Sequence, residues 1–267
     1  NSINIGRLIP QVVYYIVSYL ELVNINKIKL GDKVNFVVPT GNFGNILAGY
    51  YAEQIGLPVN KLICASNNNN VLYDFLKTGV YDKNRDFLKT VSPSMDILIS
   101  SNLERLLYYV SGCDNAYVAS LMKDLKETGR FEVTREILNR IQEKFQTGFA
   151  DDLDTKQTIK KIYEKDSYLL DTHTAVAYKV LLDNLDKEHV NVVLSTASPY
   201  KFTESVYTSL NEATNEDEFT LMNKLHEQTK VAIPENLKDL DKKEIRHKDV
   251  INKNEMKKYI LEKLGDL

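Results

Sequence analysis

The chain has 267 residues, enough to bury the core of one large domain or of two modest ones. Hydrophobic residues make up 43% and charged residues 27%, which is ordinary for a globular protein, and the formal net charge of −3 gives no indication of a nucleic-acid or anionic-membrane partner. No apolar run reaches the roughly 18 residues that a membrane span requires.

Two cysteines, Cys64 and Cys113, are too few and too far apart in the sequence for a disulfide framework or a zinc site. We expect each to be a small buried or half-buried apolar residue, and we expect no metal site. Unpaired cysteines favour a reducing compartment, so the expected location is the cytoplasm.

The first part of the chain alternates helices and strands. Residues 8–23 are rich in apolar and tyrosine side chains, so we expect a helix with most of its circumference buried. Residues 34–38 predict a short buried strand, followed by a helix from residue 46 that ends before Gly56. A second short strand is expected over 61–65. A strand, a helix and a strand in this order predict a right-handed parallel crossover.

The rest of the chain adds helices, one strand and a tail. Helical spacing predicts helices over 102–111, 117–128, 132–145, 155–165 and 174–184, and an apolar run predicts a buried strand over 190–195. We expect residues 114–168 to form a mostly helical excursion on the surface rather than part of the central sheet. The tail from residue 234 onward is highly charged and predicts an amphipathic helix over about 253–264.

The turn after the first strand is the strongest candidate for a binding site. It consists of Gly41, Asn42, Phe43, Gly44 and Asn45: two glycines that can take a positive φ and leave room for a ligand, and two asparagines that add side-chain donors. The following helix N-terminus presents free N–H groups and the positive end of its dipole, which suits a phosphate group. Neither the nucleotide P-loop nor the full dinucleotide fingerprint is present. A tight structural turn explains the pattern equally well.

Three turns follow predicted parallel strands, after Val38, Ala65 and Leu194. Open parallel sheets bind their ligands beyond the C-terminal ends of the strands. We therefore expect these three loops to converge on one crevice.

Five separated motifs resemble those of the threonine synthases, in the same order along the chain. They are N-S-I-N-x-x-R at 1–7, P-T-G-N-F-G-N at 39–45, A-S-N-N-N at 65–69, D-T-H-T-A at 171–175 and S-T-A-S-P-x-K-F at 195–202. The fourth departs from the family's D-P-H-T-A, because Thr172 stands in place of the proline. Threonine synthases are pyridoxal 5'-phosphate enzymes with the tryptophan-synthase-β-like fold.

The resemblance implies an α/β fold in which a parallel sheet carries helices on both faces, as three layers. Residues 1–233 would form the cofactor-binding portion of the larger domain of such an enzyme, and the charged helical tail 234–267 would pack on the same domain. Within the larger portion, Gly41, Asn42, Phe43, Gly44 and Asn45 would hold the phosphate of pyridoxal 5'-phosphate.

Further roles are implied for residues in the other motifs. Thr196 would donate a hydrogen bond to the pyridine nitrogen of the cofactor; alternatively it ends a strand and caps a turn, with Ser195 in its role. Ser2, Asn4 and Arg7 would meet the phosphate of the substrate, and a capped helix start with one exposed arginine is the alternative.

The fourth motif carries a histidine and an aspartate. For His173 and Asp171 we expect local hydrogen bonding or capping at a helix start rather than catalysis.

The lysine that holds the cofactor as a Schiff base in this family is missing. In this fold it lies well upstream of the phosphate loop, and the only lysines before Gly41 are Lys27, Lys29 and Lys33, none in the family's F-K-D-like context. We therefore expect the chain to be the C-terminal portion of a longer enzyme. It would have no catalytic residue of its own, would be inert alone, and would have the N-terminal half of the same enzyme as its partner.

The activity implied for the full-length enzyme is the conversion of O-phosphohomoserine and water to threonine and phosphate. One alternative is a related phospho-lyase that releases phosphate from the same substrate but forms 2-oxobutyrate and ammonia. Another is a non-catalytic phosphate- or metabolite-binding module with the same fold.

Overall fold

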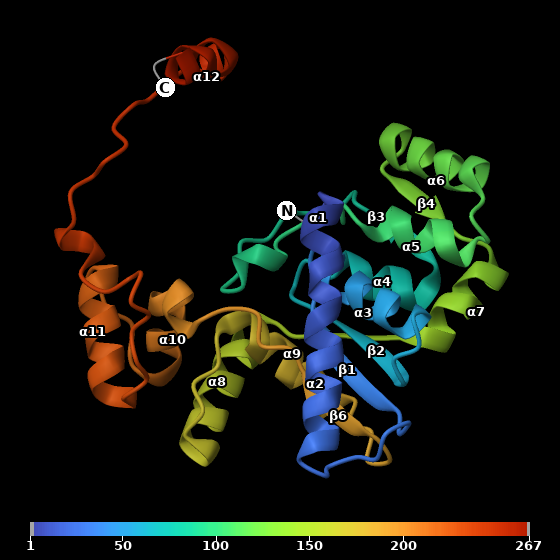
Figure 1. The fold of residues 1–267 in the computed structure, drawn as a ribbon, viewed down its shortest axis with the longest axis horizontal. Coiled ribbons are helices and arrows are strands. Elements are labelled where there is room, and N and C mark those ends of the chain that lie inside the picture. Colours follow the sequence, from blue (N-terminus) through green and yellow to red (C-terminus); the bar gives the residue numbers. More distant parts are fainter. Residues whose placement is uncertain (1–2, 266–267) are drawn as a thin grey trace. The chain divides into compact units, whose positions relative to one another are not determined.

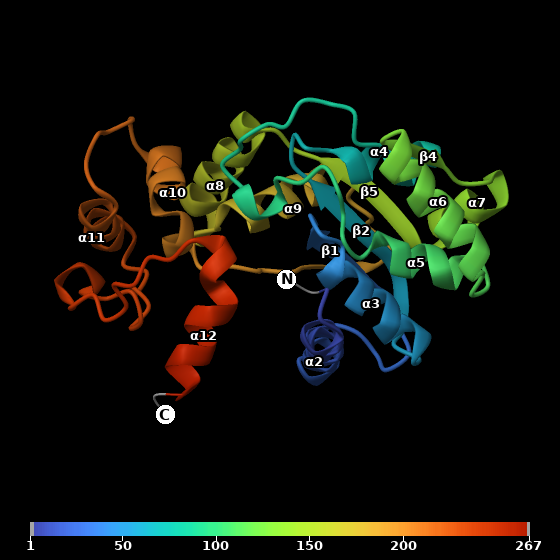
Figure 2. The ribbon, with the colours of Figure 1, turned by 90° about the horizontal axis from the view of Figure 1, so that it is seen from above.

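The structure, a computed structural model, describes residues 3–265. Its centre is a four-stranded sheet in the order β5-β2-β1-β6; Figure 1 labels β1, β2 and β6, and Figure 2 labels β5. The strands are β1 (Val34–Pro39), β2 (Val59–Ser66), β5 (Phe145–Phe149) and β6 (Val190–Val193). All pairings are parallel: β1 lies between β2 and β6, and β5 pairs with β2.

Helices cover both faces of the sheet, because side chains along each strand alternate between two hydrophobic clusters. Phe36 and Val38 of β1 belong to one cluster, and Val37 belongs to the other. The first cluster includes residues of α2 (Val12–Asn24), α3 (Gly44–Gln54), α4 (Val71–Thr78) and α5 (Leu103–Val110), and the second includes residues of α9 (Thr172–Asp183). Figure 2 shows α2 and α3 on one side of the sheet and α9 on the other. The predicted α/β fold is confirmed.

The region predicted as a helical excursion is mostly helical but also supplies a strand of the central sheet. Its helices are α6 (Asn115–Glu127), α7 (Arg135–Lys144) and α8 (Asp152–Asp166), and its short β4 (Arg130–Glu132) pairs antiparallel with β3 (Val80–Asp82). Because β5 pairs with β2, the expectation that this region stays outside the sheet is wrong. β5 is an edge strand with polar Gln146 and Thr147, so it lacks the apolar run that marks a buried strand.

The first helical region is less buried than we expected. It consists of α1 (Ile5–Leu8), a 3-10 turn that contains Pro10, and α2. Tyr15 and Tyr19 bury one side of α2, whereas Val13 and Val17 are exposed on another side. The prediction that most of the circumference is buried is therefore wrong for the described chain.

The strand β6 is half-buried along its length, whereas β1 is buried throughout. The expected buried strand over 190–195 is therefore wrong in burial and too long at its end. The cause is the edge position of β6, since no strand within residues 3–265 pairs with its outer side.

The chain divides into two compact units, Asn1–Val231 and Ala232–Leu267. The larger unit ends with α10 (Thr203–Leu210) and α11 (Glu218–Thr229), and the smaller carries α12 (Met256–Gly265). That the charged tail packs on the larger unit stays a prediction. No helix in the described part of the chain is long and apolar enough to cross a membrane.

Candidate cofactor-phosphate site

The strand β1 leads into a turn that is fixed by hydrogen bonds. The Thr40 N–H donates to the Ala65 carbonyl at 2.8 Å, and Thr40 Oγ1 donates to the Val38 carbonyl at 2.7 Å. Because β1 ends at Pro39 and α3 begins at Gly44, residues 40–43 form the whole connection. The predicted strand-to-helix turn is confirmed.

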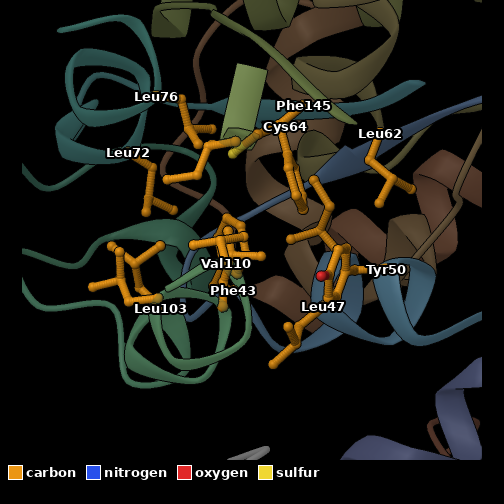
Figure 3. Packing of buried hydrophobic residues seen from close by; sticks show 14 of the residues in the cluster. Phe43, Leu47, Tyr50, Leu62, Cys64, Leu72, Leu76, Leu103, Val110 and Phe145 are labelled. Atoms are coloured by element: carbon orange, nitrogen blue, oxygen red, sulfur yellow. The ribbon is translucent and has the colours of Figure 1, made fainter. Parts of the chain in front are cut away.

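The two glycines do not take the backbone conformation that we expected. Neither Gly41 nor Gly44 has a positive φ; the left-handed residue is Phe43, with φ of 59°. A left-handed phenylalanine is uncommon, and here its ring is buried, with its centre 5.6 Å from the ring centre of Phe145. Figure 3 shows Phe43 among other core side chains such as Leu103. Its side chain is therefore committed to the core, and only its main chain faces the turn.

Gly41 is required by a close approach of backbone rather than by its φ angle. A Cβ atom here would lie 3.0 Å from the Cα atom of Met95 and 3.0 Å from the carbonyl oxygen of Ser94. Both neighbours are backbone atoms, which cannot move aside as the end of a flexible side chain does. The segment that contains Ser94 and Met95 thus covers the turn.

In this turn the carbonyl oxygens are occupied and the N–H groups are free. The carbonyls of Gly41, Asn42 and Phe43 accept hydrogen bonds from Ser100 Oγ at 3.0 Å, Asn102 Nδ2 at 2.8 Å and the Leu47 N–H at 3.2 Å, respectively. For the N–H groups of residues 41–46, no residue within 3–265 serves as acceptor. Free N–H groups at the start of a helix of 11 residues favour an anion, because the helix dipole is positive there.

The asparagine side chains of the turn are oriented by hydroxyl groups. Ser101 Oγ donates to Asn42 Oδ1 at 3.2 Å, and the Tyr15 hydroxyl lies 2.8 Å from Asn45 Oδ1. With each Oδ1 engaged, the Nδ2 hydrogens remain as donors. This geometry agrees with the side-chain donors expected at both positions.

A cavity of about 350 Å³ lies over the turn and brings together most of the predicted site residues. Gly41–Asn45, Thr196 and Arg7 all line it. Ser2 lies outside the described residues. Asn4 does not line the cavity; its side chain accepts the N–H of Gly6 at 2.9 Å and caps α1, which was the structural alternative for this residue.

Thr196 is linked to a buried polar network at the start of α9. Its N–H donates to Thr174 Oγ1 at 3.4 Å, and Thr174 Oγ1 donates to the carboxylate of Asp171. Asp171 also accepts the N–H groups of His173 and Thr174, so it caps α9 as predicted. Burial alone would raise the pKa of Asp171, but the hydrogen bonds from His173 and Thr174 outweigh burial and hold this pKa below its usual value.

His173 adds a long-range contact to the local ones that we expected. Its Nδ1 lies 3.3 Å from Asp171 Oδ1, while its Nε2 accepts the N–H of Ser94 at 3.1 Å. The ring also lies 4.5 Å from the ring of Phe202. His173 is buried and lines the cavity, so it helps to hold Ser94 over Gly41.

Two buried asparagines fix the segment that covers the turn. Asn67 Nδ2 and Asn69 Nδ2 both donate to Oδ1 of Asp96, at 2.8 and 2.9 Å. Asp96 directly follows Met95. The polar loop after β2 therefore supports the cavity from behind rather than lining it.

Sequence reasoning missed several residues that line the cavity. Ser94 and Met95 occur in a segment without periodicity or motif, so no sequence signal identified them. Lys201 also lines the cavity. It lies within the fifth motif, and its spacing from Thr196 there could have identified it from the sequence. Lys201 is exposed, its Nζ lies 5.3 Å from the ring centre of Phe202, and it forms no ion pair with any carboxylate in the described chain.

The residues around the cavity fit the phosphate end of pyridoxal 5'-phosphate. The turn offers main-chain N–H donors, two amide side chains and a helix N-terminus, and none of the described residues that line the cavity carries a carboxylate to repel an anion. Within residues 3–265 no group of three His, Cys, Asp or Glu side chains could hold a metal ion.

Comparison with known proteins identifies relatives of this chain. Residues 174–260 match the family model for the C-terminal part of threonine synthase. Human Threonine synthase-like 1 is 42% identical over 79% of this chain and 28% of its own length. Threonine synthase of Saccharomyces cerevisiae is 40% identical over 80% of this chain and 45% of its own length.

Solved structures show the same relationship. The PLP-bound threonine synthase from Brucella melitensis aligns with a TM-score of 0.75 at 41% identity, over 84% of this chain and 47% of that one. Yeast threonine synthase aligns with a TM-score of 0.82 at 37% identity, over 100% of this chain and 54% of that one. The chain thus spans about half or less of each of these relatives. It is homologous to the threonine synthases and threonine synthase-like proteins over the C-terminal part of their sequences.

Proposed function

We propose that this chain is the cofactor-binding C-terminal part of a pyridoxal-phosphate-dependent threonine synthase, which converts O-phosphohomoserine and water to threonine and phosphate. The observation that carries the proposal is the turn at 41–45, where carbonyl oxygens are occupied and N–H groups are free. Homology to threonine synthases supports the assignment of this anion site to the cofactor phosphate.

In this proposal, each part of the turn has a distinct task. Main-chain N–H groups from Gly41 to Asn45 donate to the phosphate, and the amide groups of Asn42 and Asn45 add side-chain donors. Phe43 contributes only its N–H, because its ring lies in the core. Gly41 allows Ser94 and Met95 to cover the bound phosphate and keep water from it.

Thr196 also lines the cavity, and its hydroxyl would donate a hydrogen bond to the pyridine nitrogen. The bound cofactor supplies the electron sink for proton removal next to the amino group. A hydroxyl partner leaves the ring nitrogen unprotonated, whereas a carboxylate would favour the protonated form. The Thr174–Asp171 network positions Thr196 through its N–H.

The substrate phosphate would bind at the cationic side of the cavity. Arg7 presents a guanidinium that suits a bidentate phosphate contact. Asn4 would act indirectly by capping the short helix that carries Arg7. The lysine that forms the covalent bond to the cofactor would come from the N-terminal half of the enzyme, so we propose that this chain alone is inactive. A cytoplasmic location also stays a proposal.

A second candidate is a threonine synthase-like phospho-lyase that acts on the same substrate. This candidate rests on the 42% identity to Threonine synthase-like 1, a relative that is named apart from the threonine synthases and is about as similar to this chain as yeast threonine synthase is. Product analysis of the full-length enzyme separates the two, because 2-oxobutyrate and ammonia without threonine would indicate the lyase. A non-catalytic module with this fold would bind phosphate but form neither product in the full-length protein.

The phosphate assignment can be tested on the chain itself. Asn42→Asp places a negative charge beside the free N–H groups and should weaken binding of pyridoxal 5'-phosphate by at least about tenfold. Asn139→Asp makes the same charge change on an exposed position of α7 and should leave binding unchanged. Calorimetric titration should also show competition by inorganic phosphate and weaker binding of pyridoxal, which lacks the phosphate. The assignment would be refuted if the two variants bound pyridoxal 5'-phosphate equally well, or if the chain bound pyridoxal as tightly as pyridoxal 5'-phosphate.

A further inference from the structure

A short loop covers the turn after β1 with its backbone. The base of this loop is closed on itself, because Asp96 accepts hydrogen bonds from the N–H of Thr90 at 3.0 Å and from its hydroxyl at 2.8 Å. Its tip is the 3-10 turn Pro93–Met95. We call residues 90–96 the cover loop. Because the base is fixed, the position of the tip over Gly41 depends on the contacts that the tip itself makes.

Two contacts fix the tip of the cover loop. The Met95 side chain is buried in the hydrophobic cluster that includes Val37 and Val176, on the α9 face of the sheet. The Ser94 N–H donates to Nε2 of His173, at the start of α9, at 3.1 Å. The first contact is apolar and has no preferred direction, whereas the second is directional and sets how the backbone of the tip is oriented over the cavity. His173 is therefore the polar anchor of the cover loop.

The hydrogen bond from Ser94 determines which nitrogen of His173 carries the hydrogen. A main-chain N–H can only donate, so Nε2 is the acceptor and the ring is neutral. The hydrogen is then on Nδ1, which lies 3.3 Å from Asp171 Oδ1 and 3.3 Å from the Thr172 hydroxyl. Proline, which the related motif has at position 172, could not supply the second contact. Asp171 is buried together with the ring, so it holds the tautomer and the orientation that the Ser94 N–H requires.

Asp171 also reaches the residue proposed for the pyridine nitrogen. Thr174 Oγ1 donates to the Asp171 carboxylate, and the same Oγ1 accepts the N–H of Thr196 at 3.4 Å. His173 and Thr174 both belong to the first turn of α9, where Asp171 is the N-cap. One buried carboxylate thus orients both the anchor of the cover loop and the side chain that contacts Thr196.

We propose that His173 is a positioning residue of the cofactor-phosphate site, which holds the backbone of the cover loop over the bound phosphate, and that Asp171 couples this cover to Thr196. This inference rests on the proposed function, in which the turn after β1 binds the cofactor phosphate. The ring itself donates nothing to an anion, because its Nε2 accepts from Ser94 and its Nδ1 faces Asp171. A cover that is fixed before binding excludes water and loses little freedom when the anion enters. Loosening the cover therefore weakens binding without removing a donor to the phosphate.

The test compares two amide replacements of His173 by calorimetric titration of the chain with inorganic phosphate. Glutamine is long enough to bring its Oε1 near the position of Nε2 and can accept the Ser94 N–H, whereas asparagine is one carbon shorter and cannot reach it. His173→Asn should lower the phosphate affinity by about three- to tenfold, and His173→Gln should stay within about twofold of wild type. Full affinity of His173→Asn would overturn the proposal. An equal loss in both variants would also overturn it, because His173 would then act through stability alone.

His189→Asn is the matched control. His189 also pairs with an aspartate, since its Nδ1 lies 2.8 Å from Oδ2 of Asp186, and it does not line the cavity over the turn. This variant should keep the phosphate affinity of wild type. If it lost as much affinity as His173→Asn, the effect would not depend on the cover loop, and the proposal would be wrong.

Hydrogen exchange tests the anchor without any ligand. The Ser94 amide should exchange at least about tenfold faster in His173→Asn than in wild type, because it loses its acceptor, and in His173→Gln it should exchange as in wild type. The two levels of the argument fail in different ways. If wild type binds no inorganic phosphate, the proposed function fails. If wild type binds phosphate and the exchange of Ser94 is unchanged in His173→Asn, this inference alone fails.

Discussion

The hydroxyl of Tyr15 on α2 lies 2.8 Å from both the carbonyl oxygen and Oδ1 of Asn45 on α3. Burial raises the pKa of Tyr15 well above its usual value, so the hydroxyl stays protonated and acts as the donor. This contact links α2 to a residue of the turn at 41–45. It also fixes the Asn45 amide, whose Nδ2 donates to no residue in the described part of the chain.

Replacing Tyr15 by Phe should weaken phosphate binding. The change removes the donor and leaves the ring in place, so the Asn45 amide loses its fixed orientation, at a cost of about 1 kcal/mol in unfolding free energy. Affinity of the chain for inorganic phosphate should fall by about three- to tenfold. Both quantities can be measured, by urea unfolding and by calorimetric titration.

Tyr19→Phe provides the matched control on the same helix. The Tyr19 hydroxyl accepts the Gly31 N–H at 2.8 Å and donates to the Asp32 carbonyl at 3.1 Å, and neither partner lines the cavity over the turn. This variant should lose comparable stability and keep its phosphate affinity. A similar loss of affinity in both variants would mean that Tyr15 acts through general stability only.

Lys201→Gln should lower the affinity of the cavity for inorganic phosphate by about three- to tenfold, because it removes one of the cations that line the cavity. The difference between wild type and variant should shrink as salt is raised, since the lysine is exposed and screened. Lys161→Gln, an exposed lysine of α8, is the control. If the affinities of wild type and variant do not differ, or differ equally at all salt concentrations, Lys201 does not contribute to anion binding.

The strand-to-helix turn and the residues on it were predictable because they depend on local chemistry. A β-branched run, two glycines and a helix start predict a strand-to-helix turn, and Gly41–Asn45 and Thr196 line one cavity. What could not be predicted depends on contacts distant in sequence. Only the fold reveals that Met95 lies against Gly41.

Two wrong expectations have physical causes of the same kind. The positive φ was assigned to glycine because glycine adopts it without strain, yet core packing of the Phe43 ring places it at a phenylalanine. We expected most of α2 to be buried because its residues are largely apolar. Composition does not say which side of a helix is covered, and within the described residues one side of α2 is exposed.

Asp171 predicts a pH dependence of stability. Its pKa in the folded chain lies below the usual 3.8, so the ionised carboxylate stabilises the fold at neutral pH, and this contribution is lost as pH falls below 3.8 through the folded value. Asp171→Asn should cost about 2 kcal/mol at pH 7, because hydrogen bonds to a charged acceptor are lost. The deficit relative to wild type should shrink toward pH 3 in urea unfolding.

Asp217→Asn is the control for this titration. Asp217 caps α11 by accepting the N–H groups of Phe219 and Thr220, and its pKa is also lowered, chiefly by the hydrogen bond from the Thr220 side chain. Because Asp217 is exposed, water replaces those bonds, and its variant should lose less stability at pH 7 than Asp171→Asn. If both variants lose equal stability, burial of the hydrogen-bond network that contacts Thr196 does not add to the free energy of unfolding.

Thiol reactivity should distinguish the two cysteines. Burial raises the pKa of the Cys64 thiol to about 12, so almost no thiolate forms at pH 8. Cys113 is exposed, contrary to the expectation that both cysteines are at least half-buried. Titration with a disulfide reagent at pH 8 should modify one thiol per native chain, and Cys113→Ser should abolish that reaction.

Denaturant should make the second thiol reactive, because unfolding opens the end of β2 beside Thr40. Rapid modification of both thiols in the native chain would show that water reaches Cys64. It would contradict the close packing of β2 beside the turn at 41–45.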